Sequence, residues 1–154
     1  MTQHKNLLLN NQLCFALYAA TNSIIRYYRI YLNEIGITYT QYLVLLVLWE
    51  LENCSIKVIA KTLKLDSPTI TPIVQKLEKI NLVKRQRSDE DERVVLVSLT
   101  KAGLDLEGQV ADIQNKVACK THLKTKDFNE LKATLNQLAQ TMTEKEIKLD
   151  SLLK

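Results

Sequence analysis

The spacing of apolar residues changes only once along this 154-residue chain, and that change limits the fold it can adopt. Through most of the sequence these residues recur every three or four positions, as on one face of a helix. Between residues 82 and 100 they alternate instead, in "LVKRQRS" and "RVVLVSLT", which flank the charged run "DEDE". With only three glycines and two prolines, the chain is poor in turn residues. We therefore expect a mainly helical protein with a single two-stranded hairpin.

Helical spacing predicts two long helices at the start of the chain. The first covers residues 11–34, with Asn10 or Asn11 as its N-terminal cap and Gly36 just after its end. The second follows Thr40 and carries "QYLVLLVLWE", which is apolar nearly all round. Such a helix is expected at the centre of the core.

Four further helices are expected. A short one is capped by Ser55, and the next is capped by Ser67, with a proline in its first helical position. The buried stripe of this latter helix is predicted to be Ile73, Leu77 and Ile80. After the hairpin, one helix is expected over residues 101–122 and another from Thr125 towards the end of the chain.

The order of these elements is typical of one DNA-binding fold. Three compact helices followed by a hairpin form a winged helix-turn-helix, whose third helix enters the major groove. We assign residues 37–100 to this domain. The apolar faces of the remaining helices would be exposed on a lone domain. Residues 1–36 with 101–154 are therefore expected to form a dimerisation region that pairs with a second copy.

Composition excludes several other classes. A net charge of +4 permits nucleic acid as a partner without requiring it. The chain has no apolar run long enough for a membrane span and no secretory pattern at its start, so a cytoplasmic protein is expected. Cys14, Cys54 and Cys119 lie far apart, as do His4 and His122. We expect neither a disulfide framework nor a metal site, and no cofactor.

Two polar clusters are candidates for contact with DNA. The first is the start of the fourth helix, where short or amide side chains at positions expected to be exposed suit phosphates and base edges. Its members are Ser67, Thr69, Thr71 and Gln75, and Lys76 adds charge. The alternative is an ordinary capped and solvated helix face.

The second cluster is "KRQRSDEDER", where Arg85, Arg87 and Arg93 flank an acidic tip. Asp91 and Arg93 have the spacing to lie side by side on one strand face. The carboxylate would then hold the guanidinium extended for the narrow, negative minor groove. The alternative is an ordinary charged hairpin turn.

The segment "LDSPTITPIVQKLEKINLVKRQRSDEDERVVLVSLTKAG" resembles the core of the MarR family of transcription regulators. Together with "NQLCFALYA" and "ITYTQYLVLLVLWE", it is similar to the organic hydroperoxide-sensing branch of that family, over roughly residues 10–105. The resemblance implies a redox-sensing repressor rather than an enzyme. Such a repressor binds a palindromic operator as a homodimer and is released when an organic hydroperoxide oxidises it.

The resemblance also implies roles for single residues. Cys14 stands at the place of the sensor cysteine, and Tyr28 and Tyr39 stand where two tyrosines hydrogen-bond the sensor thiolate. Cys119 lies about where some members carry a cysteine that bridges to the partner subunit. The alternative is that Cys119 only fills space at the end of a helix. From the residues alone, a cysteine in the first turn of a helix is favoured as a thiolate. Tyr18, one turn later, would line the same pocket.

Other functions remain open at this point. A regulator of the same fold can instead be gated by a small phenolic ligand, with Cys14 only packing. A thiol peroxidase would need a reductant to regenerate the cysteine, and the sequence shows no "CxxC" motif, catalytic triad or phosphate loop. A dimerisation partner without DNA affinity is the last alternative.

Overall fold

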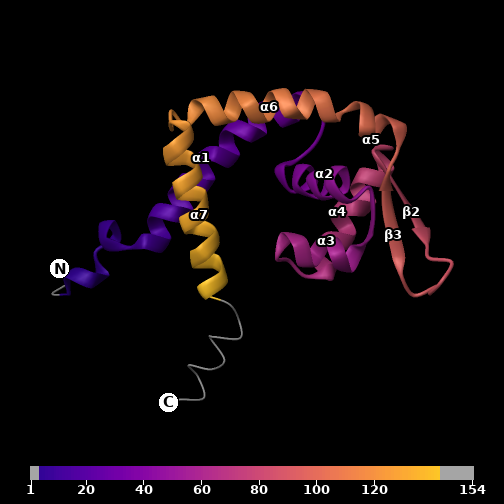
Figure 1. Cartoon of the computed structure of the whole chain (residues 1–154), viewed down its shortest axis with the longest axis horizontal. Helices are drawn as coiled ribbons and strands as arrows, with labels where there is room; N and C mark the ends of the chain where they lie inside the picture. The colour runs from indigo at the N-terminus through magenta and orange to yellow at the C-terminus, as the bar shows by residue number, and fades with distance from the viewer. Residues whose placement is uncertain (1–3, 143–154) are drawn as a thin grey trace, which may run out of the picture. The chain divides into compact units, whose positions relative to one another are not determined.

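The computed structural model describes residues 4–142, and the chain divides into two compact units, residues 1–117 and 118–154. The elements are the 3-10 turns η1 (Lys5–Leu7) and η2 (Leu9–Asn11), the helices α1 (Leu13–Glu34), α2 (Tyr39–Leu51), α3 (Ile56–Leu63), α4 (Ser67–Lys79), α5 (Lys101–Asp105), α6 (Glu107–Lys120) and α7 (Thr125–Thr141), and the strands β1 (Asn53–Ser55), β2 (Val83–Arg87) and β3 (Val95–Leu99). The predicted mainly helical fold with a winged helix-turn-helix is confirmed, with α2 to α4 grouped beside the β2–β3 hairpin (Figure 1).

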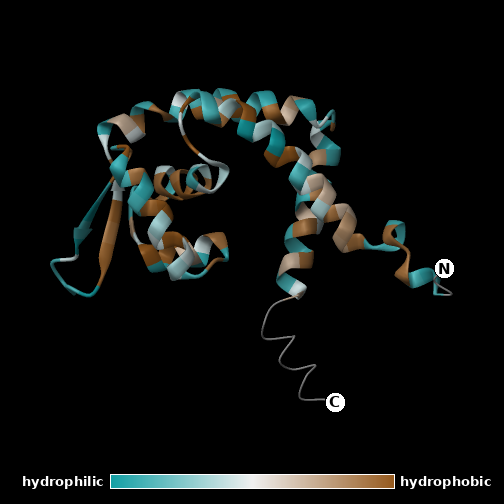
Figure 2. Ribbon diagram, turned by 180° about the vertical axis from the view of Figure 1, so that it is seen from behind, coloured by the Kyte–Doolittle hydropathy of each residue, from teal (hydrophilic) through white to brown (hydrophobic). Residues whose placement is uncertain are grey.

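The sheet has one strand more than the sequence predicts. Its order is β1-β3-β2, with both pairs antiparallel, and Cys54 of β1 lies opposite Val97 of β3. The expectation of a single strand pair was therefore wrong, because a three-residue strand is too short to show an alternating pattern. Figure 2 shows a contrast within the hairpin, with hydrophilic β2 beside hydrophobic β3.

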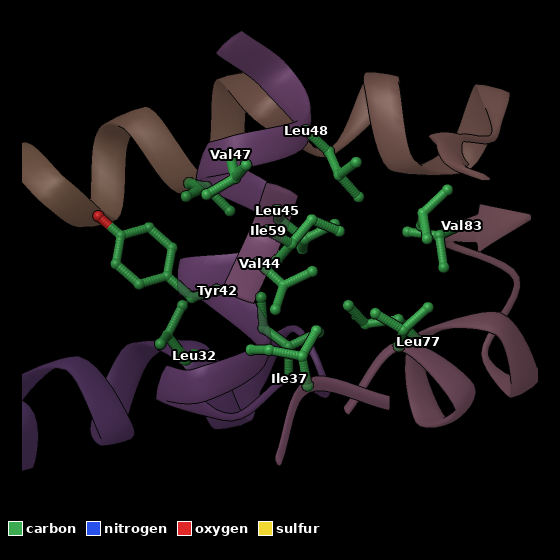
Figure 3. Close-up of a cluster of buried hydrophobic side chains, with 14 of the residues drawn as sticks. Leu32, Ile37, Tyr42, Val44, Leu45, Val47, Leu48, Ile59, Leu77 and Val83 are labelled. Atoms are coloured by element: carbon green, nitrogen blue, oxygen red, sulfur yellow. The ribbon is translucent and has the colours of Figure 1, made fainter. Parts of the chain in front are cut away.

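Helix α2 lies at the centre of the core, as its apolar sequence predicts. Val44, Leu45 and Leu48 are fully buried, and side chains of α1, α3, α4 and β2 pack around them (Figure 3). Tyr42 lies at the edge of this cluster, with its hydroxyl pointing away from the labelled aliphatic side chains. Burial of the apolar α2 residues therefore fixes one end of α1, through Leu32, against the winged helix-turn-helix.

The start of α1 differs from the prediction. Its N-cap is Gln12, whose side chain makes no capping hydrogen bond, and neither Asn10 nor Asn11 caps the helix. The Asn11 side chain instead donates to the carbonyl of Lys5, at 2.7 Å, because the preceding residues form 3-10 turns. Gly36 follows the helix end with φ +73°, a conformation that glycine adopts without strain, as predicted.

Helices α2 and α3 have clear start signals. Thr38 caps α2 in a capping box: its hydroxyl accepts from the Gln41 backbone N–H, and the Gln41 side chain accepts from the Thr38 N–H. The helix thus begins at Tyr39, slightly before the predicted start after Thr40. Ser55 caps α3 as predicted, accepting from the Val58 N–H.

Helix α4 begins one residue before the predicted start. Asp66 caps it, accepting from the Thr69 N–H at 2.8 Å, so the assignment of Ser67 as the cap was wrong. Asp and Ser are about equally good caps, so their preferences do not separate two neighbours. The buried stripe also differs from the expected one, since Ile73 is half-buried and Ile80 exposed. It consists of Ile70, Val74 and Leu77.

The single helix expected over residues 101–122 is two helices, α5 and α6, which meet at Leu106. Glycines at 103 and 108 weaken helix propensity on both sides of this junction. Thr100 caps α5, accepting from the Gly103 N–H. In the second unit, α7 begins at Thr125 as predicted, and residues 143–154 lie outside the described part of the chain.

Within residues 4–142, no helix is both long enough and apolar enough to span a bilayer.

Candidate functional site

Cys14 is the second residue of α1 and its side chain is exposed. Tyr18, one turn later on the same face, is 66% exposed. Cys54, by contrast, is buried in β1, and burial raises the pKa of its thiol. Within residues 4–117, Cys14 is therefore the thiol that an oxidant in solution reaches. The thiolate is the reactive form of cysteine, and the raised pKa of Cys54 disfavours it there.

Three tyrosines gather where α1 passes the start of α2. The ring centroids lie 5.3 Å apart for Tyr28 and Tyr39, 5.1 Å for Tyr28 and Tyr42, and 5.8 Å for Tyr39 and Tyr42. The hydroxyls of Tyr28 and Tyr42 are 3.5 Å apart. The structure therefore brings together the two tyrosines predicted from the sequence and adds Tyr42. Tyr42 lies three residues after Tyr39 on one helix, and this spacing indicates in the sequence that the two rings are neighbours.

The environment of this cluster favours the protonated form of two of its phenols, those of Tyr39 and Tyr42. Burial raises the pKa of Tyr39, and the neighbouring Tyr28 adds to the shift. Burial also raises the pKa of Tyr42, with further contributions from its hydrogen bond to Tyr28 and from the other two phenols. A protonated phenol donates one hydrogen bond, so the cluster is suited to an anionic acceptor.

Within one chain, the thiol and the tyrosine cluster are separate. Cys14 and Tyr28 are fourteen residues apart on the continuous helix α1. At a rise of about 1.5 Å per residue, their backbones are about 21 Å apart along the axis. A phenolic hydroxyl of the same chain therefore does not reach the Cys14 sulfur. Cys119 is exposed in the last turn of α6, in the second unit.

The predicted DNA contacts on α4 differ in exposure. Thr69, Gln75 and Lys76 are exposed, whereas Ser67 and Thr71 are half-buried. The expected exposure of these last two residues was thus wrong, because the first turn of α4 packs closely. The Thr71 hydroxyl donates to the Ser67 carbonyl at 2.9 Å, one turn back in the helix.

Arg85 is held by α4. Its Nε donates to Glu78 Oε2 at 2.8 Å, one terminal nitrogen lies 2.6 Å from the same oxygen, and its backbone N–H donates to Glu78 Oε1 at 3.3 Å. The sequence reasoning missed Glu78, which lies seven residues before Arg85, because that spacing does not select Arg85 from the neighbouring basic residues. Arg87, at the end of β2, is exposed.

The predicted pairing of Asp91 with Arg93 is different in the structure. Both residues lie in the loop between β2 and β3 rather than on a strand face. Asp91 Oδ1 accepts from the Arg93 backbone N–H at 3.0 Å, and the Asp91 carbonyl accepts from the Val94 N–H. Among residues 4–142, no ion pair joins the Asp91 carboxylate to the Arg93 guanidinium. The carboxylate stabilises the turn, as short acidic side chains commonly do.

Metal chemistry has no site in the described part of the chain, where no group of three or more His, Cys, Asp and Glu side chains is placed to hold an ion. The arrangement therefore consists of an exposed thiol, a cluster of phenolic donors, and a polar helix beside a charged wing.

Comparison with known proteins gives consistent matches. Residues 26–109 match the family of SarA/Rot transcriptional regulators. The organic hydroperoxide resistance transcriptional regulator of Bacillus subtilis is 41% identical over 137 residues, which cover 89% of this chain and 93% of that protein. Among solved structures, reduced AbfR bound to DNA is 32% identical, with a TM-score of 0.76, over 99% of this chain and 100% of that one.

A second structure of AbfR, a protein of Staphylococcus epidermidis, is of its disulfide form. It is 36% identical, with a TM-score of 0.63, over 87% of this chain and 89% of that one.

Proposed function

Since the chain belongs to the MarR/SarA family of DNA-binding transcription regulators, we propose that it is a homodimeric redox-sensing repressor with Cys14 as its sensor. It binds a palindromic operator in the cytoplasm and leaves that operator when an organic hydroperoxide oxidises Cys14. Membership of this family supports two conclusions about the chain. The chain is a transcription regulator rather than an enzyme, as the sequence predicts, and its partner is double-stranded DNA.

The observation that carries this proposal is the separation of Cys14 from the tyrosines of its own chain. An exposed thiol at one end of α1 and a cluster of phenolic donors near the other end form one site only if two α1 helices run antiparallel. A two-fold axis perpendicular to α1 gives this arrangement, and each contact is then made twice. The exposed apolar side chains Leu13 and Ile24, which lie on one face of α1, supply a surface for such pairing.

The chemistry at this paired site is an oxidation of sulfur. The Cys14 thiolate attacks the terminal oxygen of the hydroperoxide, the O–O bond breaks, and the leaving alkoxide takes a proton to become the alcohol. Cys14 is then a sulfenic acid. The thiol of the partner subunit's Cys119 condenses with it, forming an S–S bond and releasing water. Loss of the thiolate removes the acceptor of the phenolic hydrogen bonds, and the two DNA-binding units change their spacing.

Half-site spacing makes DNA affinity sensitive to this change. Two recognition helices of a dimer read half-sites one helical turn apart, about 34 Å. A shift of a few Å therefore removes one of them from its groove. The B. subtilis relative, named for organic hydroperoxide resistance, and the reduced and disulfide structures of AbfR support this reading.

The test measures DNA binding and cross-linking together. Wild-type protein on a duplex from its own promoter should lose at least tenfold in affinity, about 1.4 kcal/mol, after treatment with cumene hydroperoxide. It should also run as a covalent dimer with a Cys14–Cys119 peptide. Cys14→Ser should stay on DNA, and Cys119→Ser should form the sulfenic acid but no dimer. If Cys14→Ser still leaves the DNA on oxidation, the sensor assignment is wrong.

A regulator gated by a small phenolic ligand is the second candidate, and a cavity favours it. About 450 Å³ in volume, this cavity lies beside the tyrosine cluster, large enough for a single aromatic ring. Its lining consists of Ile25, Arg29, Asn33, Thr38, Tyr39 and Thr40. Release of DNA by a phenolic compound under reducing conditions, equally in Cys14→Ser, would establish this function instead.

A further inference from the structure

A cavity of about 440 Å³ lies where the end of α2 meets β3 and the α5–α6 junction. Its lining consists of Leu48 and Trp49 of α2, the helix cap Glu52, Leu99 at the end of β3, and Leu104 and Glu107 on either side of the junction. None of these residues belongs to the thiol and tyrosine site or to the predicted DNA contacts. Small-molecule sites commonly have such a volume, with mostly apolar walls and a few polar groups.

Trp49 is the aromatic wall of this cavity. Its indole N–H donates to the Gly103 carbonyl at 3.1 Å, which fixes the ring beside α5. The side chain is half-buried, and part of its remaining surface lines the cavity. Indole is the aromatic group that attracts cations most strongly, because the face of its π system is negative. In the described part of the chain, no Lys or Arg side chain lies over this ring.

The charges at this cavity are negative, on a chain whose net charge is +4. Glu52 and Glu107 line it, and within residues 4–142 neither carboxylate forms an ion pair. The nearest base in the sequence is Lys101 of α5, which is exposed and outside the lining. The nearest acids, Glu50 and Asp105, add to the negative charge of the region. Two carboxylates on one cavity repel each other, and a cation between them relieves the repulsion.

The remaining walls are apolar and favour an organic cation over a metal ion. Leu48 is buried and Leu99 half-buried, whereas Leu104 is 54% exposed. A ligand that covers Leu104 removes apolar surface from water. A hard metal ion takes about six oxygen ligands, and the described residues hold no group of three or more His, Cys, Asp and Glu side chains placed for one.

We propose that this cavity binds an organic cation, a quaternary ammonium or protonated amine that carries an apolar group. The positive charge lies against the Trp49 ring and near the carboxylates of Glu52 and Glu107, and the apolar group covers Leu104. The bound ligand contacts residues on both sides of the α5–α6 junction. Binding requires neither Cys14 nor DNA, so this inference goes beyond the proposed function and is independent of it.

Tryptophan fluorescence tests this site directly, because Trp49 is the only tryptophan of the chain. Reduced full-length protein is titrated with benzyltrimethylammonium at an ionic strength of about 0.15 M, where charges more than about 8 Å apart are largely screened. Benzyl alcohol and benzoate are the comparison ligands, since they share the ring but are neutral and anionic.

Three variants remove the carboxylates: Glu52→Gln, Glu107→Gln and the double substitution. Glu50→Gln is the matched control, because it removes the same charge from an exposed α2 residue outside the lining. Thermal unfolding without ligand confirms that each variant is folded.

The cation should change Trp49 emission saturably, with a dissociation constant on the order of 1 mM, as suits a ligand of this size. Each single variant should weaken binding about two- to fivefold, because it removes one exposed charge contact. The double variant should bind most weakly, and Glu50→Gln should bind as wild type does. Benzyl alcohol and benzoate should produce no saturable change at the same concentrations.

Three results would overturn the site. Benzyl alcohol binding as tightly as the cation would mean that the cavity does not recognise charge. Equal losses in Glu50→Gln and in the lining variants would mean that the cation responds to the general charge of the surface. Emission that does not saturate with the cation would mean that no site exists. Hydroperoxide and DNA are absent throughout, so failure of the proposed function leaves these readings unchanged.

Discussion

Gly103 is placed where no side chain fits. A Cβ atom at this position would lie 2.1 Å from the carbonyl oxygen of Leu82. The Gly103 carbonyl accepts from the Trp49 indole N–H at 3.1 Å, and the Gly103 N–H donates to the Thr100 hydroxyl. The Thr100 hydroxyl in turn donates to the Asn81 carbonyl at 2.6 Å. These contacts join α2, α5 and the turn after α4, which explains why "SLTKAG" contains a glycine here.

Gly103→Ala should therefore destabilise the protein. Because the clashing atom belongs to the backbone, the turn after α4 has to move, at a cost of about 1–3 kcal/mol. Gly108→Ala is the matched control: its Cβ would meet nothing within 4 Å in α6, and alanine is the better helix former by up to about 1 kcal/mol. Urea unfolding should shift the two midpoints in opposite directions. A Gly103→Ala midpoint at or above that of wild type would contradict the close packing.

At the scale of elements, the Glu78–Arg85 pair joins α4 to β2. β2 is an edge strand of the sheet, and Glu78 accepts from one of its outward backbone N–H groups as well as from the guanidinium. The Arg85 guanidinium holds the pKa of the Glu78 carboxyl below its usual range. The pair thus stabilises the wing at pH values above the ordinary glutamate pKa. This contribution is lost as pH falls through the lowered value.

A double-mutant cycle tests this pair. Glu78→Gln and Arg85→Gln should each lower Tm by about 1–4 °C at pH 7, the range of a surface pair, and the double variant should lose little more. The coupling should shrink as the pH is lowered through the depressed pKa of Glu78, because the carboxyl then becomes protonated. The exposed Lys126–Glu130 pair, at 3.8 Å, is a control expected to show no measurable coupling. Full additivity at pH 7 would mean that the two residues act independently.

The same elements show what the sequence can predict. Long periodic helices and the β2–β3 hairpin were predictable, because burial imposes their spacing over many residues. The strand β1 was not, since three residues carry no period. The roles of Asp91 and Glu78 were not predictable either. Each carboxylate lies near several hydrogen-bond donors, and only the local geometry decides which of them it binds. Composition and spacing identified the charged wing but not its pairings.

For the whole molecule, the position of Cys14 on α1 has a consequence for assembly. In the proposed dimer, each sensor site takes its thiol from one copy and its phenolic donors from the other. When only one of the two chains is substituted, a change at Cys14 and a change at Tyr28 therefore affect different sites of the dimer. A chain with Cys14→Ser loses its own thiol but still offers Tyr28 to its partner, whereas a chain with Tyr28→Phe keeps its thiol and offers no Tyr28 hydroxyl.

Mixing two impaired chains should therefore restore one complete site. Cys14→Ser homodimers should not respond to peroxide, and Tyr28→Phe homodimers should respond slowly. Their heterodimer pairs an intact Cys14 with an intact Tyr28 at one of its two sites. The matched control joins wild type to a chain carrying both substitutions, which has one intact copy of each residue but no complete site.

The readout is the rate of sulfenic acid formation in tagged, purified heterodimers. The mixed pair should approach half the wild-type rate, since one of two sites is complete, whereas the control should approach half the Tyr28→Phe rate, since it has one thiol and no complete site. Equal rates in both heterodimers would mean that Tyr28 does not act across the interface. A faster control would place the thiol and the phenol in the same chain, which the separation of about 21 Å along α1 opposes.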